Sequence, residues 1–410
     1  HRTSRVDAIL NRRCLTLAEA LKANGYTTLM SGKWHLGNPG ENSAPTQRGF
    51  DRYFGMLYGA ASYFAPYGLT RDLDNVEHEA QDPDFYLTDA ITENAIEFIE
   101  ETDSKDPLFL YLAYTAAHWP LHARSEDIAL YKGNYAMGWD KLREQRHRRM
   151  RELGVIESWT ELSPRHSTVP SWESEEHKEW QQRRMEVYAA QITVMDRGIG
   201  RVIETLNRTG RLENTLVIFM VDNGGCHVEY EPERTGTFLP QETRDGRPII
   251  PGNLPEVMPG PEHSYQSYGY GWANASNTPF RWFKKYDHEG GIHTPMIASW
   301  PAGISRDGEI EKQVAHLIDI FPTIVDITGA DLPDTVNGIQ RHAIDGKSLA
   351  PLFQGLKREP HGHLFFQHSE GRAIRQGKWK LVQERQSGTW ELYQLDRDPS
   401  ELNDLAAEMP

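Results

Sequence analysis

Cysteine is scarce in this chain, with two among 410 residues, Cys14 and Cys226. Two cysteines cannot build the disulfide framework on which many small secreted domains depend, so that class of fold is excluded. Long apolar runs are missing as well. No stretch approaches 18 consecutive apolar residues, so the sequence contains no candidate for a membrane-spanning helix.

A surplus of basic residues is also absent, because 44 Lys and Arg stand against 59 Asp and Glu and give a formal net charge of −15. This balance argues against nucleic acid as a partner, since nucleic-acid-binding proteins present basic surfaces. Any site for an anion must therefore be locally basic. A chain of this length exceeds one compact core, and we expect one large domain with a smaller one.

Residues 25–37 combine a short apolar run with a glycine-flanked Lys and His. The run predicts a brief buried strand, and Gly32 and Gly37 allow the backbone to turn sharply after it. Lys33 and His35 would then face one cavity. A Lys and a His at the exit of a strand suit the binding of an oxyanion.

The same arrangement of an apolar run followed by polar residues occurs twice more. Residues 108–113 lead to His118, and residues 216–221 end in Asp222 and Asn223. Continuous apolar runs are typical of parallel strands covered on both faces, and ligands bind outside the carboxyl ends of such strands. Alone, His118 would be interpreted as a packed side chain and Asp222-Asn223 as part of a turn. Three such strand exits together favour one shared site.

Five segments, in this order and at this spacing, resemble the type I sulfatases of the alkaline-phosphatase-like superfamily, in particular the bacterial arylsulfatases. The resemblance extends from about residue 7 to the end of the chain and loosens over residues 123–184 and 229–268. The matching segments are residues 25–37, 117–120, 187–200, 222–225 and 277–292.

The resemblance assigns roles to four cationic side chains. It implies that Lys33 neutralises sulfate oxygens and that His35 assists the collapse of a covalent intermediate. His118 and Lys284 would bind the sulfate and stabilise or protonate the departing oxygen. Lys285 adjoins Lys284, and an exposed Lys-Lys pair is usually a solvated surface, but the spacing of the family motif selects Lys284.

The resemblance also implies a calcium ion held by Asp222 and Asn223, with magnesium as the alternative. Carboxylate and amide oxygens are hard ligands suited to either ion, and the segment contains no thiolate or imidazole cluster that would indicate zinc. Transfer of a sulfuryl group spreads negative charge over several oxygens. A metal ion and fixed cations would therefore lower the barrier electrostatically.

One family feature is missing. The nucleophile of these enzymes is a formylglycine made from the Cys or Ser of a Cys/Ser-x-Pro-x-Arg motif, and the chain contains no such motif. Ser43 begins a near match with Gln47 in place of Arg, and we interpret it as part of a loop. We expect that the chain beginning at His1 lacks an upstream segment carrying the formylglycine, which a formylglycine-generating or anaerobic maturation enzyme would produce. The 410 residues alone would then be inactive.

The resulting hypothesis is hydrolysis of a sulfate ester at its S–O bond, with a small molecule or a glycan as the sulfated substrate. A phosphoester or phosphonate hydrolase of the same superfamily is one alternative, and a truncated, non-catalytic anion-binding protein is another. The resemblance implies a periplasmic or secreted protein, with a cytoplasmic location as the alternative.

The expected architecture is an α/β fold with a large mixed, mostly parallel sheet flanked by helices. Helices are expected at residues 15–24, 87–101 and 187–207. We place this catalytic domain at residues 1–356. Residues 357–410 would form a smaller domain with an antiparallel sheet followed by a docking helix.

Three further segments have simple interpretations. Residues 141–184 are dense in Arg, Glu and Lys, which indicates a solvated helical insertion. Residues 234–271 are rich in Gly and Pro and predict a long loop over the site. The six aromatic residues within 53–67 either line a pocket for the leaving group or pack in the core.

Overall fold

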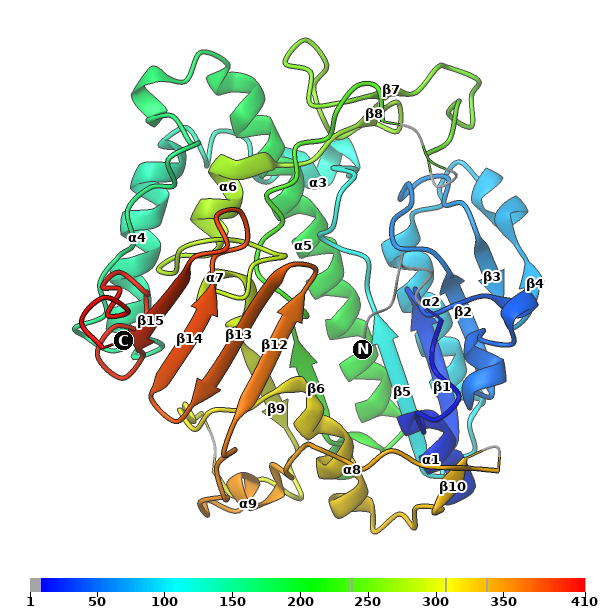
Figure 1. Ribbon diagram of the computed structural model, residues 1–410. Helices are drawn as coiled ribbons and strands as arrows, with labels where there is room; N and C mark the ends of the chain where they lie inside the picture. Colours follow the sequence, from blue (N-terminus) through cyan, green and yellow to red (C-terminus); the bar gives the residue numbers. More distant parts are fainter. Residues whose placement is uncertain (1–8, 235, 237–238, 307, 337, 410) are drawn as a thin grey trace.

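The computed structural model describes residues 9–409 apart from 235, 237, 238, 307 and 337 (Figure 1). The start of the chain at His1, which the sequence analysis interprets as a truncation, lies outside the described residues. The helices are α1 Leu17–Ala23, α2 Leu87–Glu101, α3 Ser125–Ala129, α4 Gly138–Glu152, α5 Lys178–Arg208, α6 Gly269–Ser276, α7 Glu289–Ile292, α8 Ile320–Thr328 and α9 Ala350–Phe353. The strands are β1 Thr27–Gly32, β2 Arg52–Met56, β3 Leu69–Arg71, β4 Asp74–Asn75, β5 Leu108–Ala113, β6 Val217–Met220, β7 Ile250–Pro251, β8 Ser264–Tyr265, β9 Met296–Ser299, β10 Thr335–Val336, β11 Ile339–Gln340, β12 Leu364–His368, β13 Gly371–Gln376, β14 Trp379–Gln383 and β15 Trp390–Gln394.

The main sheet has five strands in the order β4-β3-β2-β1-β5. β1 runs parallel to both of its neighbours, β2 and β5, whereas β3 and β4 continue the sheet as antiparallel strands. Gly32, the last residue of β1, lies opposite Ala113, the last residue of β5. The expected α/β fold with a mixed, mainly parallel sheet is confirmed, and the carboxyl ends of β1 and β5 meet at one edge.

β1 is buried on both faces because its alternate side chains pack against different elements. Leu29 packs in the core cluster that includes Leu87 and Ile91 of α2. Met30 packs on the other face with Ala18 of α1. Successive side chains of a strand point to opposite faces, so this short apolar run serves two core layers.

α1 has a local signal that explains where it begins. The Thr16 hydroxyl accepts a hydrogen bond from the Glu19 backbone N–H at 2.9 Å, and the Glu19 carboxylate accepts one from the Thr16 N–H at 2.8 Å. This reciprocal capping box satisfies two backbone donors that the first helical turn leaves free. The capping box therefore explains why α1 begins at Leu17. The helix ends just before Gly25, and β1 follows from Thr27.

The apolar run at residues 216–221 does not join the main sheet as the expected parallel strand. Its central part, β6, pairs antiparallel with β9 in a separate two-stranded sheet. Phe219 is 37% exposed, so β6 is not covered on both faces. In Figure 1 the long helix α5 lies between β5 and the β6–β9 pair. An apolar run indicates a strand but does not specify its partner or direction, which explains this error.

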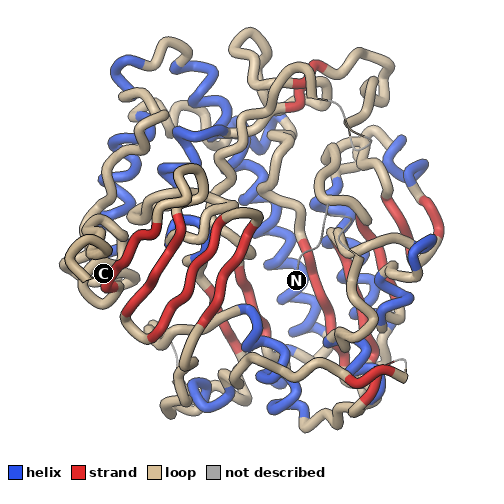
Figure 2. Tube along the Cα trace, in the orientation of Figure 1, coloured by secondary structure: helices blue, strands red, loops and turns tan. Residues whose placement is uncertain are grey.

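The C-terminal part forms the expected antiparallel meander, with strands in the order β12-β13-β14-β15 (Figure 2). The predicted boundary near residue 357 falls between α9 and β12. The docking helix is wrong for the described residues, because the segment from β15 to residue 409 consists of turns and bends. In place of a helix, hydrogen bonds to Asp398 hold this segment in a turn. The Asp398 carboxylate accepts from the Leu402 and Asn403 N–H groups at 2.8 Å each.

The predicted insertion at residues 141–184 is helical only in part and is not simply solvated. Trp172 is buried and packs with Trp139 and Trp272 in a core cluster of large aromatic side chains. The few apolar residues of this segment are therefore large enough to build a core face, although charged residues outnumber them. The described residues within 234–271 are mostly irregular, as expected, apart from the short β7 and β8 and the start of α6. No helix in the described part of the chain is long and apolar enough to span a membrane.

A cation cluster at the strand ends

The exit of β1 places Lys33 and His35 through tight backbone packing. Gly32 has φ 120°, and a Cβ at this position would lie 2.0 Å from the Ala113 carbonyl oxygen, so only glycine fits. The Lys33 N–H donates to that carbonyl at 2.8 Å, and the His35 N–H donates to the Leu57 carbonyl at 3.0 Å. The chain is thus held between β2 and β5 as it leaves the sheet.

The ring of His35 lies against Gly59, a residue that the sequence did not indicate as part of the site. His35 has φ 58°, a backbone region that residues other than glycine rarely adopt. A Cβ on Gly59 would lie 2.6 Å from the imidazole ring. Gly59 therefore leaves the room in which His35 sits. In the sequence, the only signal for this role of Gly59 was its position within the aromatic segment 53–67.

His118 follows β5 and is fixed by two hydrogen bonds. Its Nδ1 lies 2.9 Å from the Trp119 carbonyl oxygen, and its own carbonyl accepts the Tyr63 hydroxyl at 2.9 Å. Because a carbonyl oxygen can only accept, Nδ1 carries the proton in the neutral ring. Nε2 is then the nitrogen that can accept a proton.

Lys284 and the Asp222-Asn223 pair are brought together by the segment 277–292. The Lys284 N–H donates to the Gly225 carbonyl at 3.1 Å, and the Gly224 N–H donates to the Gly291 carbonyl at 3.0 Å. The Asn277 side chain accepts from the Gly225 N–H at 2.7 Å. Hydrogen bonds therefore join the segment 277–292 to the residues that follow β6, although the two are distant in sequence.

The four predicted cationic residues lie close enough to perturb one another. Burial and the neighbouring Lys284 lower the pKa of Lys33, while Asp222 opposes this shift. Burial, followed by Lys33 and Lys284, lowers the pKa of His35. Burial and the same two lysines lower the pKa of His118 to about 3. The structure thus brings Lys33, His35, His118 and Lys284 to one place, with Asp222 at its edge, while the individual roles remain predictions.

Asp222 and Asn223 offer the kind of oxygen ligand that a calcium or magnesium ion prefers, but two residues are fewer than such an ion needs. Ca²⁺ takes about six to eight oxygen ligands, and these two residues supply hard carboxylate and amide oxygens. The Asn223 Nδ2 donates to the Gly224 carbonyl at 2.9 Å, so the orientation of this amide is set by the turn. Among the described residues no group of three or more His, Cys, Asp or Glu could hold a metal ion. Asp222 and Asn223 therefore supply only part of the ligand set that such an ion needs.

Ser43 does not serve as a substitute nucleophile. Its side chain is buried, and its hydroxyl donates to the Leu36 carbonyl at 2.7 Å. The Ser43 carbonyl in turn accepts the Trp34 indole N–H at 2.7 Å. This residue ties down the loop after β1, in agreement with its interpretation as a loop residue.

The aromatic segment divides into core and surface members. Tyr53, Phe54, Tyr63 and Phe64 are buried, so packing explains them. Tyr58 and Tyr67 form a pair with ring centroids 5.2 Å apart, and Tyr67 is 39% exposed. Tyr58 adjoins Gly59 in the sequence, and Gly59 lies against the ring of His35. Core packing does not fully account for the Tyr58–Tyr67 pair, so this pair remains the candidate for a contact with a leaving group.

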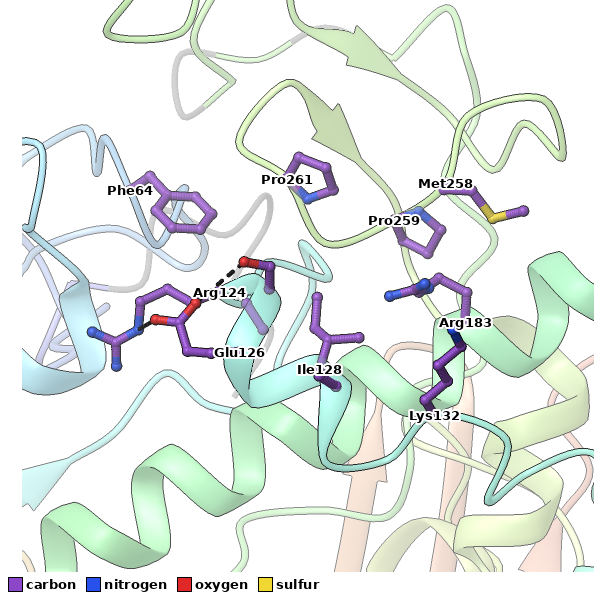
Figure 3. A pocket seen from close by; sticks show the side chains of 12 residues that line it. Phe64, Arg124, Glu126, Ile128, Lys132, Arg183, Met258, Pro259 and Pro261 are labelled. Carbon is purple, nitrogen blue, oxygen red and sulfur yellow. Dashed lines mark hydrogen bonds and ion pairs between the residues drawn. The ribbon is translucent and has the colours of Figure 1, made fainter.

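A separate cavity of about 680 Å³ lies between α3, the start of α5 and the loop before β8 (Figure 3). Apolar side chains form most of its walls, and Arg124, Lys132 and Arg183 lie at its border. Arg124 is paired with Asp89 at 2.7 Å. The cavity is lined by Phe64, Ala123, Arg124, Ser125, Glu126, Ile128, Ala129, Lys132, Arg183, Met258, Pro259 and Pro261. It contains none of the six predicted site residues, so it is distinct from the cation cluster.

Comparison with known protein families accounts for nearly the whole chain. A family model described as Sulfatase matches residues 3–330. A second model, described as N-sulphoglucosamine sulphohydrolase, C-terminal, matches residues 279–409. The second match begins well before the meander, so it covers both the Lys284 segment and the C-terminal sheet.

Among solved structures, that of Ps i-CgsB is similar, with a TM-score of 0.64 and 23% identity over 98% of this chain and 73% of that chain. At this identity the likeness concerns the fold alone. The curated relatives are more similar in sequence. The arylsulfatase of Klebsiella aerogenes is 36% identical over 78% of this chain and 69% of its own length. The uncharacterized sulfatase PB10D8.02c of Schizosaccharomyces pombe is 34% identical over 98% of this chain and 75% of its own length. The chain therefore belongs to the sulfatase family, the sulfuric ester hydrolases of the alkaline-phosphatase-like superfamily.

Proposed function

We propose that the cation cluster binds the sulfate group of an arylsulfatase-like substrate and that the family's hydrolysis of the S–O bond takes place there. The observation that carries this proposal is the mutual electrostatic influence of Lys33, His118 and Lys284. Cations that repel one another without a bound anion form a site that an anion would stabilise. The acidic chain thus has the locally basic site that an anionic substrate requires.

The balance of charges favours singly charged esters. His118, with a pKa of about 3, is neutral near pH 7. Lys33, Lys284 and Asp222 then give these groups a net charge of about +1 when both lysines are protonated. A sulfate monoester carries one negative charge and a phosphate monoester nearly two. For the cluster without a metal ion, this charge favours a sulfate ester or a phosphodiester over a phosphate monoester, whereas a calcium ion at Asp222 and Asn223 would raise the net charge of the site.

The residues of this chain would divide sulfate binding and leaving-group stabilisation among them. Lys33 would hold non-bridging sulfate oxygens from the β1 end, where its backbone is fixed to Ala113. Lys284 would stabilise or protonate the departing oxygen, because its ammonium group can donate a hydrogen bond to it. His35 would assist the breakdown of the sulfated intermediate. The attacking group is not assigned to any of these 410 residues, and a formylglycine would supply it.

The substrate class is proposed from the surroundings of the cluster. Tyr58 and Tyr67 offer aromatic faces to an aryl or sugar leaving group. Two structures of similar fold were determined with sulfated or carrageenan-type sugars: Ps i-CgsB with k-i-k-neocarrahexaose, and BT4656 with D-glucosamine-2-N,6-O-disulfate. We therefore propose aryl or glycan sulfate esters as substrates, with calcium at Asp222 and Asn223 when the full ligand set is present.

The proposal is tested by binding of nitrophenyl sulfate and nitrophenyl phosphate, measured by calorimetry, together with release of nitrophenolate. We expect tighter binding of the sulfate ester and a loss of about tenfold or more in its affinity on Lys284→Met. Lys285→Met, which removes an exposed neighbour, should leave the affinity unchanged. Equal losses in both variants would show that the wrong lysine was chosen, and tighter binding of the phosphate ester would favour the phosphatase alternative.

A non-catalytic anion-binding protein is the second candidate, and one observation favours it. The 410 residues contain no Cys/Ser-x-Pro-x-Arg motif. Sulfate-ester binding at the cluster without release of nitrophenolate is expected both of this candidate and of a sulfatase without its formylglycine. Turnover by the same preparation would exclude it.

A further inference from the structure

A buried ion-pair triad joins the C-terminal sheet to the segment that carries Lys284. Lys380 of β14 is fully buried, and its Nζ lies 2.8 Å from Glu289 Oε1 and 2.8 Å from Glu401 Oε1. Glu401 Oε2 accepts the Glu289 backbone N–H at 2.8 Å. The second carboxylate oxygen of Glu289 lies 2.7 Å from Nδ1 of His293. Every carboxylate oxygen of the triad thus faces a cation or a donor.

The position of Lys380 in its strand is unusual. Side chains alternate along β14, so Lys380 lies on the same inward face as Val382, which is completely buried. Burial alone would lower the pKa of Lys380, but Glu289 and Glu401 outweigh it and raise this pKa. Lys380 therefore remains charged inside the protein. A buried ion triad is weak evidence for stability, because hydrophobic residues often pack equally well in its place.

Glu289 connects this triad to the cation cluster through a short run of backbone contacts. It is the first residue of α7, and the next residue, Gly290, donates its N–H to the Arg281 carbonyl at 3.1 Å. The Gly291 carbonyl accepts the Gly224 N–H at 3.0 Å. A Cβ on Gly224 would lie 1.8 Å from the Gly290 carbonyl oxygen. The two glycine pairs are in direct contact, so displacement of Glu289 must displace the residues after β6.

The same loop carries the second cation. Lys284 lies five residues before Glu289, and its N–H is bound to the Gly225 carbonyl at 3.1 Å. The loop is closed by Asn277, whose Nδ2 donates to the Trp282 carbonyl at 2.9 Å and whose Oδ1 accepts from Gly225. A shift at Glu289 therefore reaches Lys284 from one side and Asp222-Asn223 from the other.

We propose that Lys380, acting through Glu289 and Glu401, is a positioning residue that holds Lys284 and the Asp222-Asn223 turn in register for the sulfate group. The C-terminal sheet thereby takes part in forming the anion site, although Lys380 itself does not face the cluster. This inference deepens the proposed function and rests on it.

The test compares Lys380→Met with Lys378→Met, a control two residues away in the turn before β14 whose exposed side chain lies over Trp379. Two readouts are needed, both at temperatures where circular dichroism shows each variant folded. One is the affinity for inorganic sulfate by calorimetry. The other is hydrogen–deuterium exchange of peptides covering residues 222–225, 277–292 and 364–394, which requires no ligand.

In Lys380→Met we expect a loss of sulfate affinity of about tenfold or more, because small misplacements of binding groups are costly. Exchange should accelerate at residues 222–225 and 277–292, and Lys378→Met should resemble the wild type in both readouts. Faster exchange confined to residues 364–394, with unchanged sulfate affinity, would show a merely structural role and overturn the inference.

A second variant covers the case in which Lys380→Met does not fold. Glu289→Gln keeps the size of the side chain and weakens only the ion pairs with Lys380 and His293. It should accelerate exchange at residues 222–225, and wild-type exchange there would overturn the inference. If the wild-type protein binds no sulfate at all, the proposed function is contradicted, and the exchange data alone decide whether Lys380 positions the loop.

Discussion

At the scale of single residues, the cation cluster brings together positively charged groups that repel one another in the folded protein. Burial and Lys284 lower the pKa of Lys33, which means that the charged form of Lys33 is less favourable in the folded state than in the unfolded state. Sites that bind ligands commonly carry such a cost in stability. The cluster should therefore reveal itself through stability measurements without any enzyme assay.

Lys33→Met should stabilise the protein by roughly 0.5–2 kcal/mol in anion-free buffer near pH 7, because it removes repulsion while retaining an apolar stem. The benefit should fade as the pH rises toward the ordinary pKa of lysine, where the unfolded state also loses the charge. Urea unfolding at several pH values measures this effect. Lys33→Met should also lose the stabilisation that added sulfate gives the wild type, and destabilisation by this change would contradict the interpretation.

His118 provides a second residue-scale prediction, based on proton uptake. Its pKa of about 3 is set by burial and two lysines, and a bound anion would offset the lysines and raise this pKa. The complex then binds more protons than the free protein, so sulfate affinity should rise as the pH falls toward 3. Calorimetry in buffers of different ionisation enthalpy measures the protons taken up. His118→Asn should reduce that uptake, whereas an unchanged value would assign it to His35 or another group.

Gly59 tests the geometry around His35. A methyl group at this position would lie 2.6 Å from the imidazole, so Gly59→Ala must displace the ring or the backbone. We expect sulfate affinity to fall by about tenfold or less, since His35 is one of several contributors. Gly362→Ala is a suitable control because neither glycine has a positive φ, while nothing lies within 4 Å of a methyl added at Gly362. Equal effects of the two changes would show a general loss of stability.

At the scale of elements, local signals predicted some segments well. α2 begins and ends at the predicted residues 87 and 101, and α1 is bounded by a capping box and a glycine. α1 carries its own start and stop signals in sequence, whereas α2 has no side-chain cap and was predicted from the helical spacing of its apolar residues. β6 carried only an apolar run, and its partner β9 lies about 75 residues away in the chain, so its direction could not be derived locally.

The residues of the candidate site likewise divide into those that a local sequence signal indicated and those that it did not. Lys33, His118 and Asp222 follow apolar runs, which made them visible as strand exits. Lys284 was selected only by resemblance to a family, because its loop has no strand before it. Gly59 and Lys380 were missed, since one acts by leaving space and the other is a lysine at an inward strand position. Such roles depend on neighbours distant in the chain.

Asn277 allows the loop itself to be tested as an element. Its side chain is buried and bonds to both the Gly225 N–H and the Trp282 carbonyl. Asn277→Ala leaves two polar backbone groups without partners, which should lower the free energy of unfolding by about 2–4 kcal/mol. Chemical denaturation measures this loss. Asn274→Ala, a nearby buried asparagine with one long hydrogen bond of 3.3 Å, is the control and should cost less.

At the scale of the whole molecule, the C-terminal sheet is bound to the α/β part by polar contacts from several elements. Besides the Lys380 triad, Arg281 donates to the Tyr393 hydroxyl at 2.9 Å, and the Ser400 hydroxyl donates to the Glu161 carbonyl at 2.7 Å. His288 lies 2.8 Å from Glu391. These contacts reach both the Lys284 segment and the region before α5. We therefore expect the boundary at residue 357 to separate secondary-structure patterns and not units that unfold independently.

The corresponding prediction is that the chain unfolds in one cooperative transition. Differential scanning calorimetry should give equal calorimetric and van't Hoff enthalpies, the signature of a two-state process. If residues 357–410 unfolded independently, a separate transition with about an eighth of the total enthalpy would appear, because unfolding enthalpy scales with chain length. Added sulfate should shift the single transition upward as a whole, since the anion site uses residues held by both parts. A sulfate-insensitive minor transition would show that the C-terminal sheet folds without the site and would contradict the positioning role of Lys380.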